Sequence, residues 1–134
     1  MIDYLNEIFT AVAAPLREAH EGITVTGEYT RRPSLFPTVT LDEIENVVVD
    51  NLEDSSAAER FSGLTYRLQV FSNKQSGKKA EARAIFATAD STMRGLGFRR
   101  ITYTTTPEIY ESTIYSITAT YAAIAGADGV MYKR

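Results

Sequence analysis

The first apolar pattern in the chain has the spacing of an amphipathic helix, with hydrophobic residues three or four positions apart. The predicted buried face consists of Ile2, Leu5, Phe9, Val12 and Leu16, with Ile8 and Ala13 beside it. Pro15 has no backbone N–H and its ring collides with the preceding turn, so we expect a kink or an early end near Ala14. Gly22 is a natural end for the segment.

The clearest strand pattern lies near the middle of the chain, over residues 64–71. Leu64, Tyr66, Leu68 and Val70 alternate with mostly polar positions there. Because successive side chains of a strand point to opposite faces, these four residues are expected on one buried face.

A second helical pattern begins after a turn at residues 72–77, where Ser76 is a suitable N-cap. Gly95 and Gly97 supply its C-terminal end. The predicted buried face consists of Ala82, Ile85, Phe86, Ala89, Met93 and Leu96.

Shorter strands and loops account for the rest of the chain. Alternating patterns predict strands over residues 23–29, 38–41, 98–106 and 113–124, and residues 44–49 either continue the second of these strands or begin another. The other segments are predicted as a loop at 31–37, a mobile acidic loop at 50–60, turns at 107–112 and 126–129, and a short strand or tail at 130–134.

These elements predict one α+β domain over residues 1–134, in the order α-β-β-β-α-β-β with a possible last strand. Short turns or loops join most strands, which favours a mainly antiparallel sheet. Each helical pattern has a single apolar face, so we expect the two helices to pack on one face of the sheet.

Composition excludes several classes of protein. The chain has no cysteine, which removes disulfides, zinc–thiolate sites and thiol nucleophiles. Its first residues are acidic and amphipathic, unlike a signal peptide, so we expect synthesis in the cytoplasm without export. The longest weakly polar stretch, residues 117–130, is too short and too polar to span a bilayer, and we expect no membrane association.

No motif for catalysis or metal binding stands out. The only histidine, His20, follows the first predicted helix, where a cation suits the helix dipole. The acidic group at residues 42–45 alternates across a strand or lies at its end, and the group at 50–54 lacks the ligand pattern and central glycine of a calcium loop. Residues 76–79 lack the upstream glycine of a phosphate-binding loop. We therefore predict a protein that is not an enzyme, with no catalytic residues, no cofactor and no metal.

Charge is unevenly distributed along the sequence. Residues 1–60 carry four Arg or Lys against twelve Asp or Glu, whereas residues 61–134 carry ten against five. The more ordinary interpretation is that both halves share one fold and the charges mix over its surface. The alternative is a molecule with an acidic side and a basic side, in which electrostatic complementarity selects a neighbour and its register.

Basic residues also lie near aromatic ones in the second half of the chain, an arrangement found in nucleic-acid-binding proteins. The residues concerned are Lys74, Lys78, Lys79, Arg83, Arg99 and Arg100, with Phe71, Phe98 and Tyr103. An overall pI near 5.2 argues against an independent nucleic-acid binder, and strand alternation places Arg99 and Arg100 on opposite faces. We expect no sequence-specific binding of nucleic acid.

Four segments resemble a known family of phage proteins. They are residues 36–43 (FPTVTLDE), 66–74 (YRLQVFSNK), 76–82 (SGKKAEA) continuing to 93–98 (MRGLGF), and 113–121 (TIYSITATY). In order and spacing they resemble the tail-terminator, or tail-completion, proteins of long-tailed bacteriophages and prophages, which are often labelled minor capsid or head–tail joining proteins. One departure is Ser116, a position where members of this family often carry arginine.

The resemblance implies a structural virion protein that forms a ring, expected to be a hexamer, which caps the finished tail tube and joins it to the neck of the head. The implied partners are further copies of the chain, the tail tube protein and a neck or head-completion protein. The implied location is the tail–neck junction of the virion, after assembly in the cytoplasm of the bacterial host. The family brings no catalytic residues.

Partner contacts are expected at the two irregular segments and at the start of the second helix. The predicted interface residues are Arg31, Arg32, Leu35, Phe36, Glu53, Asp54, Lys78, Lys79 and Arg83. Two alternatives stay open: a head-closure or connector protein of the same head–tail module, and a small module that binds a ligand or nucleic acid.

Overall fold

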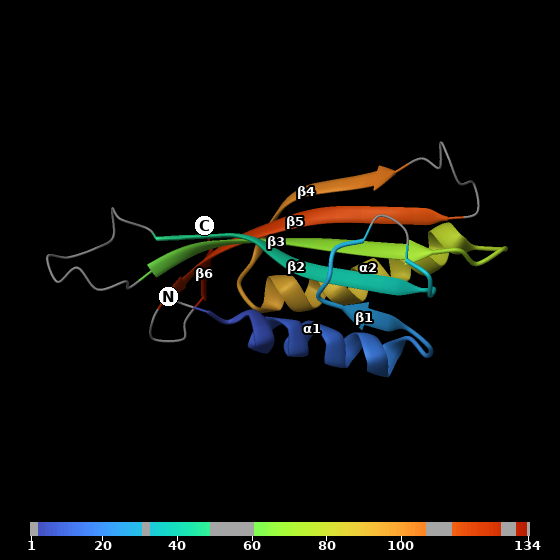
Figure 1. The fold of residues 1–134 in the computed structure, drawn as a ribbon, viewed down its shortest axis with the longest axis horizontal. Helices are drawn as coiled ribbons and strands as arrows, with labels where there is room; N and C mark the ends of the chain where they lie inside the picture. Colours follow the sequence, from blue (N-terminus) through green and yellow to red (C-terminus); the bar gives the residue numbers. More distant parts are fainter. Residues whose placement is uncertain (1–2, 31–32, 49–60, 107–113, 127–130, 134) are drawn as a thin grey trace, which may run out of the picture.

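A mostly antiparallel sheet with two helices on one face makes up the part of the chain that the structure, a computed structural model, describes (Figure 1). This part covers residues 3–30, 33–48, 61–106, 114–126 and 131–133. The helices are α1 (Leu5–Ala19) and α2 (Lys78–Gly95), and the strands are β1 (Thr24–Thr26), β2 (Thr38–Val48), β3 (Phe61–Ser72), β4 (Arg99–Thr106), β5 (Tyr115–Gly126) and β6 (Met131–Lys133). The α+β class and the predicted order of elements are confirmed, and β6 is the possible last strand.

The order of strands in the sheet is β1-β2-β3-β5-β4, and β6 pairs with the far end of β5. Only β1 and β2 are parallel, while the pairs β2–β3, β3–β5, β5–β4 and β5–β6 are antiparallel. In the central pair Tyr66 of β3 lies opposite Tyr121 of β5. The two edges of this order are therefore β1, which follows α1, and β4, which follows α2.

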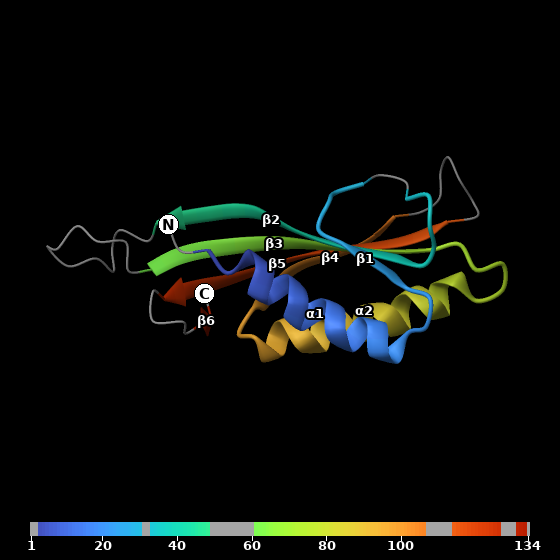
Figure 2. The same ribbon diagram turned by 60° about the horizontal axis from the view of Figure 1, so that its bottom comes forward.

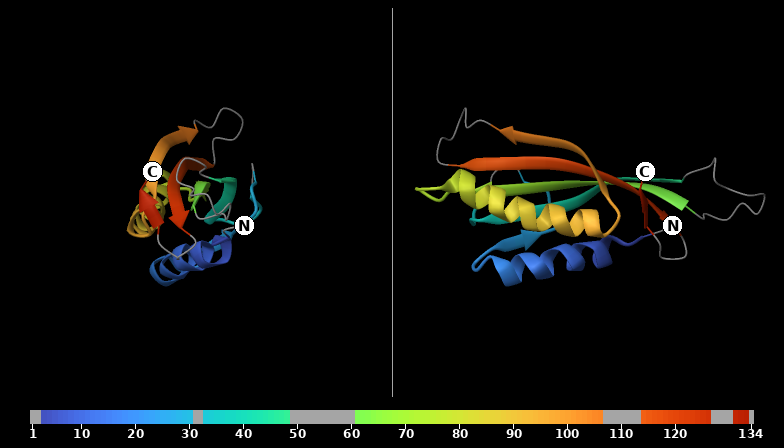
Figure 3. Two further views of the ribbon diagram at one scale, coloured as in Figure 1. Left: turned by 90° about the vertical axis from the view of Figure 1, so that its left-hand side faces the viewer. Right: turned by 180° about the vertical axis from the view of Figure 1, so that it is seen from behind.

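The hydrophobic core lies between the sheet and the helices, which run side by side beneath it (Figures 2 and 3). Leu64, Tyr66, Leu68 and Val70 are fully buried, which confirms the face predicted for the central strand. Five of the residues predicted for the second helix are also buried, namely Ala82, Ile85, Phe86, Ala89 and Met93. Burying each large side chain of this kind contributes about 1.5–3 kcal/mol.

Helix α1 differs from its prediction in two ways. It continues through Pro15 to Ala19, so the expected early end near Ala14 is wrong. Val12 and Leu16 are buried on either side of Pro15, and this packing outweighs the loss of one backbone hydrogen bond. The buried face consists of Ile8, Val12, Ala13 and Leu16, whereas Leu5 is exposed and Phe9 is only half-buried. Ile2 lies outside the described residues.

The start of α2 also differs from its prediction. Gly77, not Ser76, is the N-cap residue, and no side chain caps the helix there. Gly77 has φ +93°, a left-handed conformation that other residues adopt with strain. The predicted C-terminal end is confirmed, since α2 ends at Gly95 and Gly97 has a positive φ of 101°.

Several strand boundaries in the structure differ from those predicted from the sequence. The strand predicted over residues 23–29 is only Thr24–Thr26. Residues 44–48 continue the strand that begins at Thr38, with a bulge between Glu43 and Glu45 that the alternation of side chains did not reveal. The predicted loop at 50–60 and the turn at 107–112 lie outside the described residues, as does most of the turn at 126–129.

The helix-free face of the sheet is partly covered by the segment between β1 and β2. Tyr29 from this segment packs against Arg67 of β3, with the guanidinium 4.1 Å from the ring centroid. The Thr38 hydroxyl donates a hydrogen bond to the Leu35 carbonyl, which fixes the end of the segment. Pro33 is buried, whereas Leu35 remains 61% exposed.

Candidate functional site

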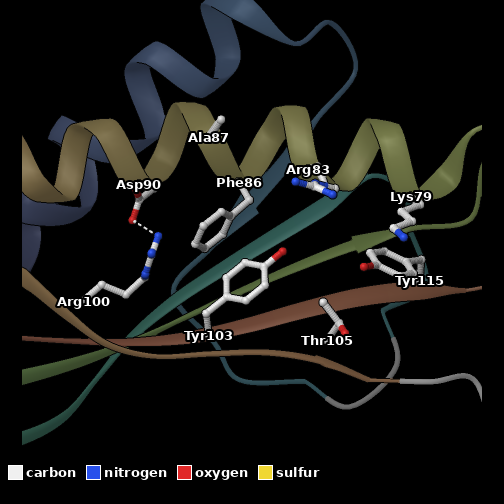
Figure 4. Close-up of a pocket in the computed structure, with 9 residues that line it drawn as sticks. All are labelled: Lys79, Arg83, Phe86, Ala87, Asp90, Arg100, Tyr103, Thr105 and Tyr115. Atoms are coloured by element: carbon white, nitrogen blue, oxygen red, sulfur yellow. Dashed lines mark hydrogen bonds and ion pairs between the residues drawn. The ribbon is translucent and has the colours of Figure 1, made fainter.

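A pocket of about 540 Å³ lies between α2 and the edge strand β4. Lys79, Arg83 and Asp90 line it from α2, as Figure 4 shows. The opposite wall includes Arg100 and Tyr103 from β4. We call this hollow the α2–β4 pocket. Its position follows from the fold. Helix α2 packs mainly on the central strands β3 and β5, so the edge strand β4 lies to one side of the helix and a hollow remains between them.

Aromatic rings form the floor of the α2–β4 pocket. Phe86 of α2 meets Tyr103 of β4 edge to face, with ring centroids 5.0 Å apart. Phe86 is 7% exposed and Tyr103 is 42% exposed, so the tyrosine ring is the part of the pair that a partner can reach. The Arg100 guanidinium lies 5.7 Å from the centroid of this ring. The floor therefore offers an apolar surface beside positive charge.

Among the described residues, Asp90 is the one carboxylate that lines the pocket, and it already has partners within the chain. Its Oδ1 accepts hydrogen bonds from the Tyr121 hydroxyl at 2.6 Å and from Arg100 at 3.2 Å. Arg94 lies 3.9 Å from its Oδ2. Burial, followed by the hydrogen bond to Asp90, raises the pKa of Tyr121 well above its usual value. Tyr121 thus stays protonated as a donor, and the charge of Asp90 is balanced within the protein.

Lys79 and Arg83 differ from Asp90, because no carboxylate among the described residues pairs with either of them. Both side chains are exposed, and they stand one helical turn apart on the side of α2 that faces β4 (Figure 4). Lys78, the third predicted interface residue of this helix, is half-buried and does not line the pocket. The structure therefore brings two of the predicted interface residues together in one positively charged hollow.

A second carboxylate network crosses from β2 to β3. Asp42 forms an ion pair of 2.7 Å with Arg67, and Glu43 accepts a hydrogen bond of 3.0 Å from the Tyr66 hydroxyl. Burial, and then the charge of Glu43, raises the pKa of Tyr66 above its usual value. Two of the three acids of the predicted cluster on this strand, Asp42 and Glu43, are thus held by neighbours, whereas Glu45 is exposed.

The other predicted interface residues are not gathered at the pocket. Leu35 is exposed and Phe36 half-buried in the segment that crosses the helix-free face. Arg31, Arg32, Glu53 and Asp54 lie outside the described residues. His20 is the C-cap residue of α1, as predicted from its position at the helix end, and its Nε2 lies 2.9 Å from the Thr88 hydroxyl.

Sequence reasoning missed Asp90 and Tyr121 as partners and Tyr103 as the exposed ring of the pocket. The sequence did predict that Arg100 and Arg99 point to opposite faces, because side chains alternate along β4. Its direction toward α2 depends on the pairing of β4 with β5, which only the folded sheet defines. Phe71 and Phe98, which had been grouped with the basic residues, are 4% and 1% exposed and belong to the interior.

Exposed charges of opposite sign in the described part of the chain lie toward opposite edges of the sheet. The exposed carboxylates lie beside α1, β1 and β2 and form what we call the acidic flank: Asp3, Glu7, Glu18, Glu21, Glu28 and Glu45. The exposed bases, apart from Arg17 on α1, lie beside α2 and β4 and form the basic flank: Lys74, Lys79, Arg83, Arg94, Arg99 and Arg100. Apart from Arg17, the placement of these exposed residues fits the alternative of a molecule with an acidic side and a basic side.

The described residues also bear on metal binding and on membrane insertion. Among the described residues, no three His, Asp or Glu side chains are grouped so that they could hold a metal ion. Neither described helix is long and apolar enough to cross a membrane.

Comparison with known proteins adds no relative. No protein-family model matches the sequence, and no curated protein is significantly similar to it. The resemblance to tail-terminator proteins thus stays a prediction from the sequence segments, and the function has to be argued from the surface.

Proposed function

We propose that this chain is a structural subunit of a tailed phage or prophage, which assembles into a ring that terminates the tail tube and joins it to the neck of the head. The observation that carries the proposal is the separation of exposed charge into an acidic flank and a basic flank. Support for the phage setting comes from the resemblance of residues 36–43, 66–74, 76–82, 93–98 and 113–121 to tail-terminator proteins.

The two flanks favour a head-to-tail contact. A surface that is acidic on one side and basic on the other repels a second copy placed acid to acid, and attracts one placed acid to base. Such a contact joins different patches on the two copies, and its repetition closes into a ring when the rotation between copies divides a full turn. The resemblance implies six copies.

The strand order fits this arrangement. The flanks lie beyond β1–β2 and beyond β4, at opposite edges of the sheet, so each copy can contact two neighbours at once (Figure 1). The described carboxylates nearest to the buried tyrosines, Glu43 and Asp90, already accept hydrogen bonds. The exposed charges on the flanks, in contrast, are available to a partner.

The mass of the purified chain in solution tests the ring. At low ionic strength we expect particles of six times 14.8 kDa by native mass spectrometry and light scattering. At about 1 M salt the Debye length falls to roughly 3 Å, and we expect mostly monomers. A chain that remains monomeric at high concentration and low salt would contradict the proposal.

The place of the ring in the virion requires a second experiment. We expect the purified ring to bind one end of tubes made from the tail tube protein of the same phage or prophage, as seen by negative-stain electron microscopy. Binding to the portal or connector of the head, and not to tubes, would favour a head-closure protein of the same module.

A ligand- or nucleic-acid-binding module is the second candidate, favoured by the cations and the exposed Tyr103 ring of the α2–β4 pocket. The buried Phe71 and Phe98 leave it with little of the stacking surface that single-stranded nucleic acid uses. Fluorescence anisotropy with labelled oligonucleotides distinguishes the two, because tight binding by a monomer fits only the second candidate.

A further inference from the structure

We propose that the α2–β4 pocket receives the corner between α1 and β1 of a second copy, so that Glu18 and Glu21 of that copy bind Lys79 and Arg83. We call this segment, residues 18–22, the acidic corner. The inference rests on the proposed ring and identifies which parts of the two flanks meet.

The chemistry of the pocket suits carboxylate side chains. Lys79 and Arg83 are exposed and carry no partner among the described residues, whereas Arg100 is occupied by Asp90. Phe86 and Tyr103 provide an apolar floor for the methylene groups of a glutamate. The hollow of about 540 Å³ opens at the edge of the sheet, where a protruding turn of another molecule can enter.

The acidic corner has the shape and charge of such a turn. Glu18 lies in the last turn of α1, and Glu21 follows the C-cap residue; both are exposed. Gly22, with φ +79°, reverses the chain immediately afterwards and leads into β1. The corner therefore projects two carboxylates at the end of a rigid helix.

One charge of each set, Lys79 and Glu18, lies at the unfavourable end of its own helix. The N-terminus of a helix carries partial positive charge, and Lys79 lies in the first turn of α2. The C-terminus carries partial negative charge, and Glu18 lies in the last turn of α1. Within one copy these placements oppose the helix dipoles, whereas contact between Lys79 of one copy and Glu18 of the next relieves both.

The two sites also lie at the same end of the sheet. Helix α1 runs into β1 where Thr24 stands beside Thr38, which is paired in turn with Phe71 near the end of β3. Helix α2 begins shortly after that end of β3, and Figure 3 shows both junctions at the same end of the molecule. If neighbouring copies are related by a rotation about an axis parallel to the strands, each site keeps its height along that axis. The acidic corner of one copy then lies at the same height as the pocket of the next. Glu45, in contrast, pairs at the level of Thr65, toward the other end.

Each of the two surfaces also contains one charge that would oppose the contact. Asp90 faces the pocket, but Arg94 and Arg100 balance its charge. Arg17 stands beside the acidic corner, where two carboxylates outnumber it.

Charge reversal and rescue test the contact. We expect Arg83→Glu to weaken assembly at least tenfold, measured by light scattering across a dilution series. Lys74→Glu, the same charge change on the basic flank outside the pocket, should alter assembly by less than threefold. Adding Glu21→Arg to Arg83→Glu should restore assembly to within threefold of the original chain, whereas adding Glu45→Lys should not.

Cysteine pairs test the proximity directly, because the chain has no cysteine of its own. Copies carrying Glu21→Cys are mixed with copies carrying Arg83→Cys under mild oxidation, so that a disulfide joins only different copies. We expect a covalent dimer in this mixture, and little in a mixture of Glu45→Cys with Arg83→Cys.

The outcomes separate this inference from the proposed function. Rings that form normally with Arg83→Glu, or a rescue by Glu45→Lys in place of Glu21→Arg, overturn the contact and leave the ring intact. A chain that never assembles overturns both.

Discussion

Tyr66 and Tyr121 face each other across β3 and β5, and each donates a hydrogen bond to a carboxylate on a different neighbouring element. Tyr66 reaches Glu43 on β2, and Tyr121 reaches Asp90 on α2. The pair therefore links the centre of the sheet to both flanks. Because hydroxyl groups buried at this depth need a partner, the two carboxylates stabilise the positions of the rings.

Removing either hydroxyl should destabilise the fold. We expect Tyr66→Phe and Tyr121→Phe each to lower the free energy of unfolding by about 1.5–3 kcal/mol, the range for hydrogen bonds to charged groups. Urea denaturation measures the loss. Tyr4→Phe is the matched control, because Tyr4 donates to the neutral carbonyl of Gly126 at 2.8 Å and should lose less. An equal loss in all three variants would show that the carboxylate charge adds nothing.

The same tyrosines predict how stability depends on pH. Their folded-state pKa values are raised above the usual value of 10.0, so above that pH the unfolded chain loses protons that the folded chain keeps. Their contribution is fully present below pH 10 and declines as pH rises, by about 1.4 kcal/mol per pH unit for each tyrosine. Urea midpoints between pH 9 and 11.5 should fall less steeply in each Phe variant. Parallel curves would contradict the assignment.

Two buried serines at opposite ends of β3 should respond oppositely to alanine. The Ser62 hydroxyl has no hydrogen-bond partner among the described residues, whereas the Ser72 hydroxyl donates to Glu81 at 2.6 Å. We expect Ser62→Ala to leave stability unchanged or raise it by about 1 kcal/mol, and Ser72→Ala to lower it by about 1–3 kcal/mol. Thermal unfolding followed by circular dichroism compares them. A destabilised Ser62→Ala would reveal a partner for that hydroxyl.

At the scale of elements, patterns that depended on one element alone were predictable from the sequence. The alternation from Leu64 to Val70 and the apolar face of α2 agree with the structure, because each pattern corresponds to one continuous buried face of a single element. Features that depend on two elements were not predictable. The bulge at Glu43, the rotated face of α1 and the exposed Tyr103 ring follow from strand register and helix docking, which the one-dimensional pattern does not contain.

The candidate site divides in the same way. Lys79 and Arg83 could be proposed from the sequence, since basic residues at the start of a predicted helix can be identified without the structure. The contacts of Asp90 with Arg94, Arg100 and Tyr121 could not, since these residues come from α2, β4 and β5. Only the folded pocket shows which cations remain free for a partner.

The glycines at the two ends of α2, the N-cap residue Gly77 and the last residue Gly95, should respond oppositely to alanine. Gly77 has φ +93°, whereas Gly95 is helical, and an added Cβ meets nothing within 4 Å at either position. The difference is therefore one of backbone conformation alone. We expect Gly77→Ala to lower the free energy of unfolding by about 1–2 kcal/mol and Gly95→Ala to raise it by about 0.5–1 kcal/mol. Urea denaturation of both variants checks the signs, and a stabilised Gly77→Ala would contradict the left-handed start of the helix.

At the scale of the whole molecule, the charges on the flanks oppose the stability of the single copy. Lys79 and Arg83 are like charges one turn apart, and Lys79 also lies in the first turn of a helix. Each such placement costs a few tenths of a kcal/mol or more in an isolated helix. A sequence that keeps unfavourable charges on two helices at once is explained if a neighbouring copy provides the opposite charges.

This argument predicts opposite effects of one substitution on folding and on assembly. Lys79→Gln should raise the stability of the monomer by about 0.3–1 kcal/mol at low salt, because it removes a repulsion and an unfavourable dipole interaction. The measurement is urea denaturation in a Glu21→Arg background that prevents assembly. In the original background the same substitution should weaken the ring. Lys74→Gln, in the turn before α2, should change neither quantity, and the gain from Lys79→Gln should vanish at high salt, where surface charges are screened. A monomer destabilised by Lys79→Gln would show that the lysine serves the fold itself, and the charge on this flank would then need no partner to explain it.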